Sequence, residues 1–262
     1  MSVGNLELSI LWPAFLAGLL VLSTHVPLGQ QVLARGIVFI DLAVAQVAGL
    51  GVTAADALGF EPEGWRVQVA AVAAALLGAL LLTWSEKKWP EVQEALIGVL
   101  FVFAACVELL VLANNPHGGE HLKDLLVGQI LWVSPAALAP VALLYGAALI
   151  VWFGARQWLG RVGFYGLFAL LVTQSVQLVG IYLVFASLIV PALAARRFSP
   201  RWRLPVAYLV GVIGYVAGLI ASSLFDLPTG AMIVVALVAT FALMALLAPR
   251  ASNGPTRTEV PT

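Results

Sequence analysis

The chain has 262 residues, of which 62% are hydrophobic and only 10% are charged, and its formal net charge is zero. Its mean hydropathy is +1.02. A soluble domain of this length needs far more charged surface. A neutral chain also lacks the basic surface that nucleic acid requires. The composition therefore excludes a soluble globular domain and a nucleic-acid-binding protein.

Apolar runs recur along almost the whole chain. A helix crosses the hydrocarbon core of a bilayer with ~20 residues, and several runs reach that length without the short alternating strands of a membrane barrel. The sequence predicts an all-α, polytopic transmembrane bundle of about eight to nine spans. The expected spans are 9–27, 37–57, 67–85, 95–113, 127–153, 163–179, 180–195, 204–224 and 230–248.

The stretch 163–195 is the hardest part of the chain to divide. It fits two short spans that meet near Gly180, or one long tilted helix followed by a half-helix.

Basic residues gather at alternate span ends, which predicts that these ends face the cytoplasm. The remaining loops are mainly acidic, and nine spans with the N-terminus outside satisfy this segregation. We expect one transmembrane domain over 1–250 and a disordered cytoplasmic tail over 251–262. The basic residues are Arg35, Lys87, Lys88, Arg156, Arg161, Arg196, Arg197, Arg201, Arg203 and Arg250.

Two acids, Asp41 and Glu108, lie within expected spans, and His25 lies near the inner end of the first. Ionisable groups in a span are unfavourable unless they face a bundle interior or a water-filled cavity, so each is a candidate functional residue. Glu108 is expected near mid-membrane. The structural alternatives are a protonated, hydrogen-bonded Glu108 and a helix-start Asp41 stabilised by the helix dipole and Arg35.

Gln46 supplies an amide to the same span as Asp41. Five residues on a helix correspond to a rotation of roughly 140° between the two side chains. We therefore expect that Asp41 and Gln46 do not form one binding face by themselves.

An expected outer loop, NNPHGGEHLKDL, brings His117, Glu120 and His121 close together. Imidazole and carboxylate suit a divalent cation such as zinc. The two interpretations are a solvated outer loop and a site at the outer mouth that captures a cation. The spacing also matches an inverted zinc-protease motif, but that motif requires a regular helix. The two glycines after His117 argue against one.

The stretch LIVPALAARRFSPRWRLP combines a span end with four arginines and further prolines. One interpretation is a basic anchor that binds lipid headgroups. The other is an elbow on which a cytosolic protein docks. The arginines are Arg196, Arg197, Arg201 and Arg203.

Five segments resemble the membrane permeases of bacterial zinc and manganese ABC importers. PLGQQVLARGIVFIDLAVAQVAGLGV is similar to the family's Pro-Leu-Gly turn, basic loop and second span, and ALIGVLF to the start of its fourth. LLVGQILWVSPAAL, VQLVGIYLVFASLIVPALAARRF and FDLPTGAMIVV resemble later segments. Together they cover nearly the full length in the family's order.

The resemblance implies a multi-pass protein of the bacterial inner membrane that is not itself an enzyme. It implies a permease homodimer on two cytosolic ABC ATPase subunits, with an extracytoplasmic metal-binding protein delivering the cargo. The elbow at Ala195, Arg196 and Arg197, with Arg201 and Arg203 beside it, would transmit ATPase closure. No cofactor is bound permanently, since the metal ion is the transported substrate. The missing GxxxxGK[ST] phosphate loop agrees with ATP hydrolysis in a partner chain.

The chain departs from the family pattern in its second span. The family usually reads Gly-Asp-x-x-x-His, and the aligned positions here are Asp41, Leu42 and Gln46. A histidine common in the fourth span is Val102, with Glu108 deeper. Carboxylates and amides suit manganese or iron(II) better than zinc, or they form a weak pathway that releases its ion readily.

The sequence therefore predicts the permease subunit of an importer for a divalent metal, zinc or manganese, with iron as a third candidate. Asp41, Gln46, Glu108 and His25 would line the metal pathway. Two alternatives remain: a permease for a metal chelate, and a secondary transporter or channel that works alone.

Overall fold

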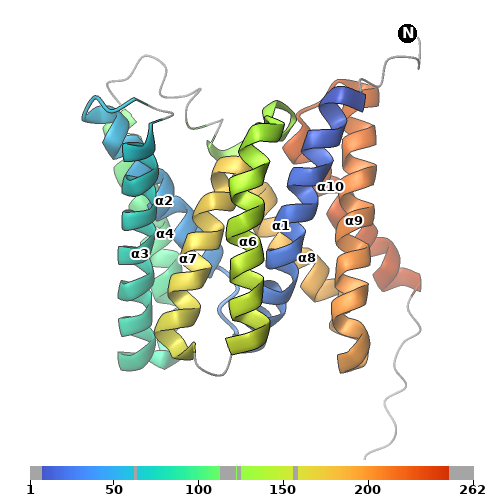
Figure 1. Ribbon diagram of the computed structural model, residues 1–262. Coiled ribbons are helices and arrows are strands. Elements are labelled where there is room, and N and C mark those ends of the chain that lie inside the picture. The colour runs from blue at the N-terminus through green and yellow to red at the C-terminus, as the bar shows by residue number, and fades with distance from the viewer. Residues whose placement is uncertain (1–7, 62–63, 113–121, 123–124, 156–158, 248–262) are drawn as a thin grey trace, which may run out of the picture.

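The computed structural model describes residues 8–61, 64–112, 122, 125–155 and 159–247. All regular elements in these ranges are helical, which confirms the all-α expectation (Figure 1). The long helices are α1 (Leu8–Arg35), α2 (Ile40–Ala57), α3 (Trp65–Lys88), α4 (Gln93–Leu112), α6 (Pro135–Ala155), α7 (Gly160–Val179), α8 (Ile181–Ala195), α9 (Pro200–Phe225) and α10 (Thr229–Leu247), and two short 3₁₀ turns are η1 (Pro90–Val92) and η2 (Ile130–Trp132).

Eight of the described helices are long and apolar enough to cross a membrane. The ninth, α8, has 15 residues, about 22 Å of helix at 1.5 Å per residue. α1 begins at the top of Figure 1 and α9 begins at the bottom. The basic ends of α1 and α3 and the arginine-rich start of α9 share this lower face, which the positive-inside rule makes cytoplasmic. We refer to it as the inner face.

The helices pack as two groups. The α2 bundle consists of α2, α3, α4 and α7, and the α1 bundle consists of α1, α6, α8, α9 and α10. In Figure 1 the α2 bundle lies at the left, and α8, α9 and α10 lie at the right. The division follows the chain only in part, because α7 returns to α3 after α6 has joined α1.

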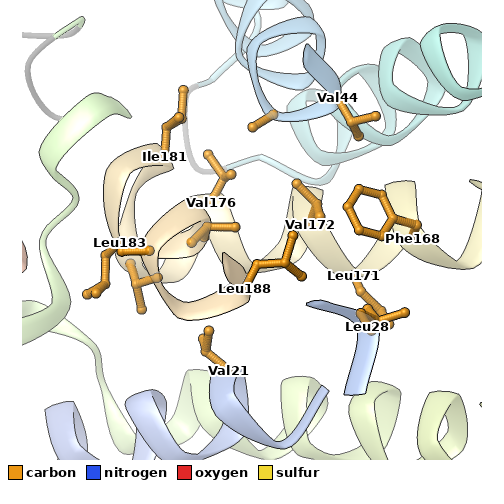
Figure 2. Close-up of a cluster of buried hydrophobic side chains, with 14 of the residues drawn as sticks. Val21, Leu28, Val44, Phe168, Leu171, Val172, Val176, Ile181, Leu183 and Leu188 are labelled. Carbon is orange, nitrogen blue, oxygen red and sulfur yellow. The ribbon is translucent and has the colours of Figure 1, made fainter. Parts of the chain in front are cut away.

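Buried aliphatic and aromatic side chains join the two bundles. Figure 2 shows this contact region, in which α7 and α8 lie between α1 and α2. Burial of apolar area in such a layer holds the helices in a fixed arrangement by dispersion and close packing. The labelled residues are Val21, Leu28, Val44, Phe168, Leu171, Val172, Val176, Ile181, Leu183 and Leu188.

The stretch 163–195 forms two helices that meet at Gly180, as the first of the two interpretations held. Gly180 has φ +83° and Gly128 has φ +70°. Their backbones cross so closely that a Cβ on Gly128 would lie 2.2 Å from the Val179 carbonyl oxygen. Only glycine fits these positions.

The expected start of a span at residue 127 is wrong. Residues 128 and 129 are not helical, η2 follows, and α6 begins at Pro135. The positive φ of Gly128 ends regular helix there, and Pro135 suits a helix start because a first-turn N–H needs no partner.

Candidate functional site

One stripe of α2 carries the polar residues Gln46 and Thr53, with Gly49 between them. Positions separated by three, four and seven residues share a helix face. This face turns toward α4, since a Cβ on Gly49 would lie 3.5 Å from Oε1 of Glu108.

Glu108 is the centre of this cluster. Gln46 Nε2 donates a hydrogen bond to its Oε2, and Thr53 Oγ1 donates one to its Oε1 at 2.9 Å. Glu108, Gln46 and Thr53 are at most 2% exposed. Because both carboxylate oxygens accept from neutral donors, the arrangement stabilises a buried negative charge. We call these three residues the Glu108 cluster.

The Glu108 cluster lies toward the outer ends of α2 and α4 as the structure describes them. Glu108 comes four residues before Leu112, the last residue of α4, and Thr53 comes four residues before Ala57. Each is therefore about 6 Å along the helix from that end. Leu125, just after the outer loop, lies beside Gly49.

Asp41 lies at the opposite end of α2, as its second residue, and is 1% exposed. The structure keeps it apart from Gln46, as the helical rotation predicts. Arg35 does not hydrogen-bond to Asp41, and its guanidinium lies 3.9 Å from the centre of the Phe164 ring. Neither carboxylate oxygen of Asp41 has a hydrogen-bond partner among the described residues.

Glu94, a residue that the sequence reasoning missed, faces the same helix end. Its Oε1 accepts a hydrogen bond from the Phe39 N–H at 3.2 Å, and Phe39 is the N-cap of α2. A carboxylate there is stabilised by the helix dipole. Glu94 therefore has the helix-start role that the sequence offered for Asp41.

His25 is buried in α1. This helix belongs to the α1 bundle, whereas the acids lie on α2 and α4 of the other bundle. The Nδ1 of His25 lies 3.0 Å from the Val21 carbonyl oxygen and 3.1 Å from Thr24 Oγ1. A bond to a carbonyl requires an N–H at Nδ1, which leaves Nε2 as a lone-pair acceptor. Nε2 has no hydrogen-bond partner in the part of the chain described.

Within the described ranges, no group of three or more His, Cys, Asp or Glu side chains is placed to hold a metal ion. The structure brings together Gln46 and Glu108 from the expected pathway, adds Thr53, and leaves Asp41 and His25 elsewhere. The outer-mouth candidates His117, Glu120 and His121 lie outside the described residues.

The elbow between α8 and α9 is short. α8 ends at Ala195 and α9 begins at Pro200. Its four arginines are exposed, and Arg203 Nε donates to the Phe198 carbonyl at 3.0 Å. Beside the elbow, residues of α1, α6, α8 and α9 line an open cavity of about 590 Å³, and Gln30, Arg196 and Arg203 are among the lining residues.

Nine apolar helices in the described part of the chain, a buried carboxylate between two of them and a basic inner elbow define a multi-pass membrane protein of the transporter class. The profile of the ABC 3 transport family matches residues 7–163 and 154–248. The chain belongs to this family and is a permease subunit of the bacterial inner membrane rather than the catalytic chain. The resemblance seen in the sequence is confirmed.

Curated relatives carry metal-transport names. The manganese transport system membrane protein MntC of Halalkalibacterium halodurans is 26% identical over 94% of this chain and 89% of its own length. The high-affinity zinc uptake system membrane protein ZnuB of Haemophilus influenzae is 23% identical over 89% and 96%. A probable iron transport system membrane protein of the same organism is 23% identical over 68% and 70%.

Solved structures share the fold. PsaBC from Streptococcus pneumoniae, solved with a Fab, matches with a TM-score of 0.74 at 20% identity and covers 93% of both chains. An inward-facing ABC transporter described as being of the metal-chelate type matches with a TM-score of 0.67 at 18% identity, over 94% of this chain and 91% of that one. At these identities the likeness concerns the architecture.

Proposed function

We propose that this chain is the permease subunit of an ATP-driven importer for divalent transition-metal ions. The observation that carries the proposal is the Glu108 cluster. A buried carboxylate held by Gln46 and Thr53 is unfavourable in a bilayer unless it serves a path for a polar or charged solute. Relatives of the chain are named for manganese, zinc and iron transport.

The ligands at the Glu108 cluster favour manganese or iron(II) as the cargo. The cluster presents a carboxylate, an amide and a hydroxyl, and Asp41 adds a second carboxylate nearer the inner face. Oxygen donors suit these ions, whereas zinc prefers imidazole and thiolate. Oxygen ligands also release an ion more readily, as a conducting pathway requires.

The cargo enters from the outer face. His117, Glu120 and His121 in the outer loop would capture the ion delivered by an extracytoplasmic binding protein. Leu125, which follows this loop, lies beside Gly49 of the Glu108 cluster, so a rearrangement of the loop would reach the cluster directly. His25 remains a pathway candidate because its Nε2 has no hydrogen-bond partner among the described residues and could bind an ion.

Energy would come from cytosolic ABC ATPase subunits bound at the inner face. The elbow would supply the docking surface through its exposed arginines Arg196, Arg197, Arg201 and Arg203, which follow the buried Ala195 at the end of α8. Arg197 also donates to the Ala245 carbonyl in α10 at 3.5 Å. A displacement of the elbow would therefore pass to α8, α9 and α10 together. A permease homodimer would place two such elbows on two ATPase subunits.

The proposal is tested by reconstituting the chain in liposomes with and without its ATPase and binding protein. We expect ATP-dependent uptake of manganese or iron(II) by the full assembly and none by the chain alone. Uptake by the isolated chain would instead identify a secondary transporter. Uptake of a metal chelate but not of the free ion would identify the chelate permease.

A further inference from the structure

Unpartnered polar atoms gather at the inner end of the α2–α4 contact. Both carboxylate oxygens of Asp41 and Oε2 of Glu94 are buried without a hydrogen-bond partner in the described chain. Buried polar groups are almost always satisfied, so each exception calls for an explanation such as an ion or water. Here three carboxylate oxygens from two acids at the same helix end lack a hydrogen-bond partner.

Glu94 is held where it can act with Asp41. Its Oε1 accepts the Phe39 N–H, two residues before Asp41, so the Glu94 carboxylate lies at the same end of α2 as the Asp41 carboxylate. The hydrogen bond uses one oxygen of Glu94 and leaves Oε2 available. The backbone N–H groups of Leu42 and Asp41 in the first turn interact with the Asp41 carboxylate, but neither forms a hydrogen bond of normal geometry with it.

The chemistry of this pair differs from that of the Glu108 cluster. Two carboxylates in a site of low dielectric constant repel each other strongly. The helix dipole of α2 compensates only part of the charge, and among the described residues no side chain donates to Asp41 as Gln46 and Thr53 donate to Glu108. A divalent cation would satisfy all three oxygens and remove the repulsion.

We propose that Asp41 and Glu94 form a second cation site, the inner carboxylate site, which the transported ion occupies after the Glu108 cluster and before it reaches the cytoplasm. The inference rests on the proposed function and adds to it Glu94 and a second binding site at the inner ends of α2 and α4. Glu94 and Glu108 are both on α4 and 14 residues apart, about 21 Å along the helix. The two sites would therefore be the two ends of one path along α2 and α4.

The test is a Mn²⁺ titration of the whole importer in nanodiscs, with unbound Mn²⁺ measured by electron paramagnetic resonance. The wild-type complex is compared with the double variant Asp41→Asn, Glu94→Gln and with Glu108→Gln. Both inner substitutions preserve shape, and Gln at position 94 keeps an oxygen for the Phe39 N–H. Glu91→Gln in the neighbouring 3₁₀ turn, where the side chain is exposed, is the matched control.

We expect the double variant to bind one Mn²⁺ fewer per permease chain and to lose at least about tenfold in uptake, with Glu91→Gln unchanged. Glu108→Gln should keep the inner site. Unchanged Mn²⁺ stoichiometry in the double variant would overturn the inference, whether or not uptake falls, because the acids would then act without binding the ion. If the wild-type importer neither binds nor transports Mn²⁺, iron(II) or zinc, the proposed function itself fails.

Discussion

The two bundles of this permease treat buried polar groups in opposite ways. In the α1 bundle most are hydroxyls that pair with each other or with the backbone, as Tyr215 does with Ser187 at 2.8 Å and Thr24 with the Val21 carbonyl at 3.2 Å, and His25 is the exception. In the α2 bundle they include the buried acids Asp41 and Glu108, the only two acids among the described residues that are fully buried.

The difference separates scaffold from pathway. Paired hydroxyls fix helices at little cost, since each bond satisfies both of its partners. A buried acid contributes little stability in a membrane and is retained where an ion must be bound or passed on. Close backbone packing through glycines accompanies the hydroxyls, as where Gly218 of α9 meets Ile233 of α10. Substitutions in the two bundles should therefore fail in different ways.

The largest effect is expected where α9 packs on α10. A Cβ on Gly218 would lie 2.4 Å from the Ile233 Cα, so Gly218→Ala must push the helices apart. We expect a loss of about 2–3 kcal/mol of stability, seen as a lower melting temperature in detergent. Gly146→Ala is the control, because nothing lies within 4 Å of that position. Equal melting temperatures for the two variants would remove the scaffold role of this contact.

The elbow gives the next effect, on assembly rather than on folding. Arg196→Glu with Arg197→Glu reverses two exposed charges, and we expect at least about tenfold weaker binding of the ATPase subunit, measured by co-purification and titration. The control is Arg66→Glu, an exposed arginine at the start of α3 on the outer side. If both variants retain normal binding and uptake, the elbow is not the docking surface.

Within the Glu108 cluster, a milder change should alter how tightly the ion is held. Thr53→Val removes the 2.9 Å hydrogen bond to Glu108, so the buried carboxylate charge is less well stabilised and the cluster loses one oxygen donor. We expect weaker ion binding, so the apparent KM for uptake rises by about tenfold or less. Thr83→Val is the matched control, since its hydroxyl bonds only the Ala79 carbonyl of its own helix. A KM equal to that of Thr83→Val would contradict this role of Thr53.

The smallest effect belongs to the hydroxyl pair of the α1 bundle. Tyr215→Phe removes a bond to Ser187, whose hydroxyl still donates to the Leu183 carbonyl at 2.6 Å. We expect about 1 kcal/mol of lost stability and unchanged uptake at matched protein amounts. A strong loss of uptake at normal stability would place the pathway in the α1 bundle instead.

Local chemistry made much of this fold predictable. Hydropathy alone locates the helices, and Gly180 marks the junction of α7 and α8 because the backbone there has φ +83°. The start of α6 was missed because residues 127–134 are as apolar as the helix that follows. Their conformation depends on the contact between Gly128 and Val179, which no local pattern contains.

The candidate site was predictable residue by residue but not as an assembly. Gln46 and Glu108 stand out as polar residues in apolar spans, and the helical period separates Asp41 from Gln46. Their actual partners depend on how α2 packs against α4. Thr53 passes as an ordinary helix residue and Glu94 as a solvated acid at a helix start. Only the tertiary structure places them against Glu108 and Phe39.

The most direct test of the account is the uptake rate of the Glu108→Gln importer in liposomes, with its ATPase and binding protein present. Cys106→Ala, an exposed position two residues away on α4, serves as the control. We expect Glu108→Gln to assemble normally and to lose at least about tenfold in Mn²⁺ or iron(II) uptake, because the cluster loses its charge. Uptake equal to that of Cys106→Ala would contradict the assignment of the pathway to the α2 bundle.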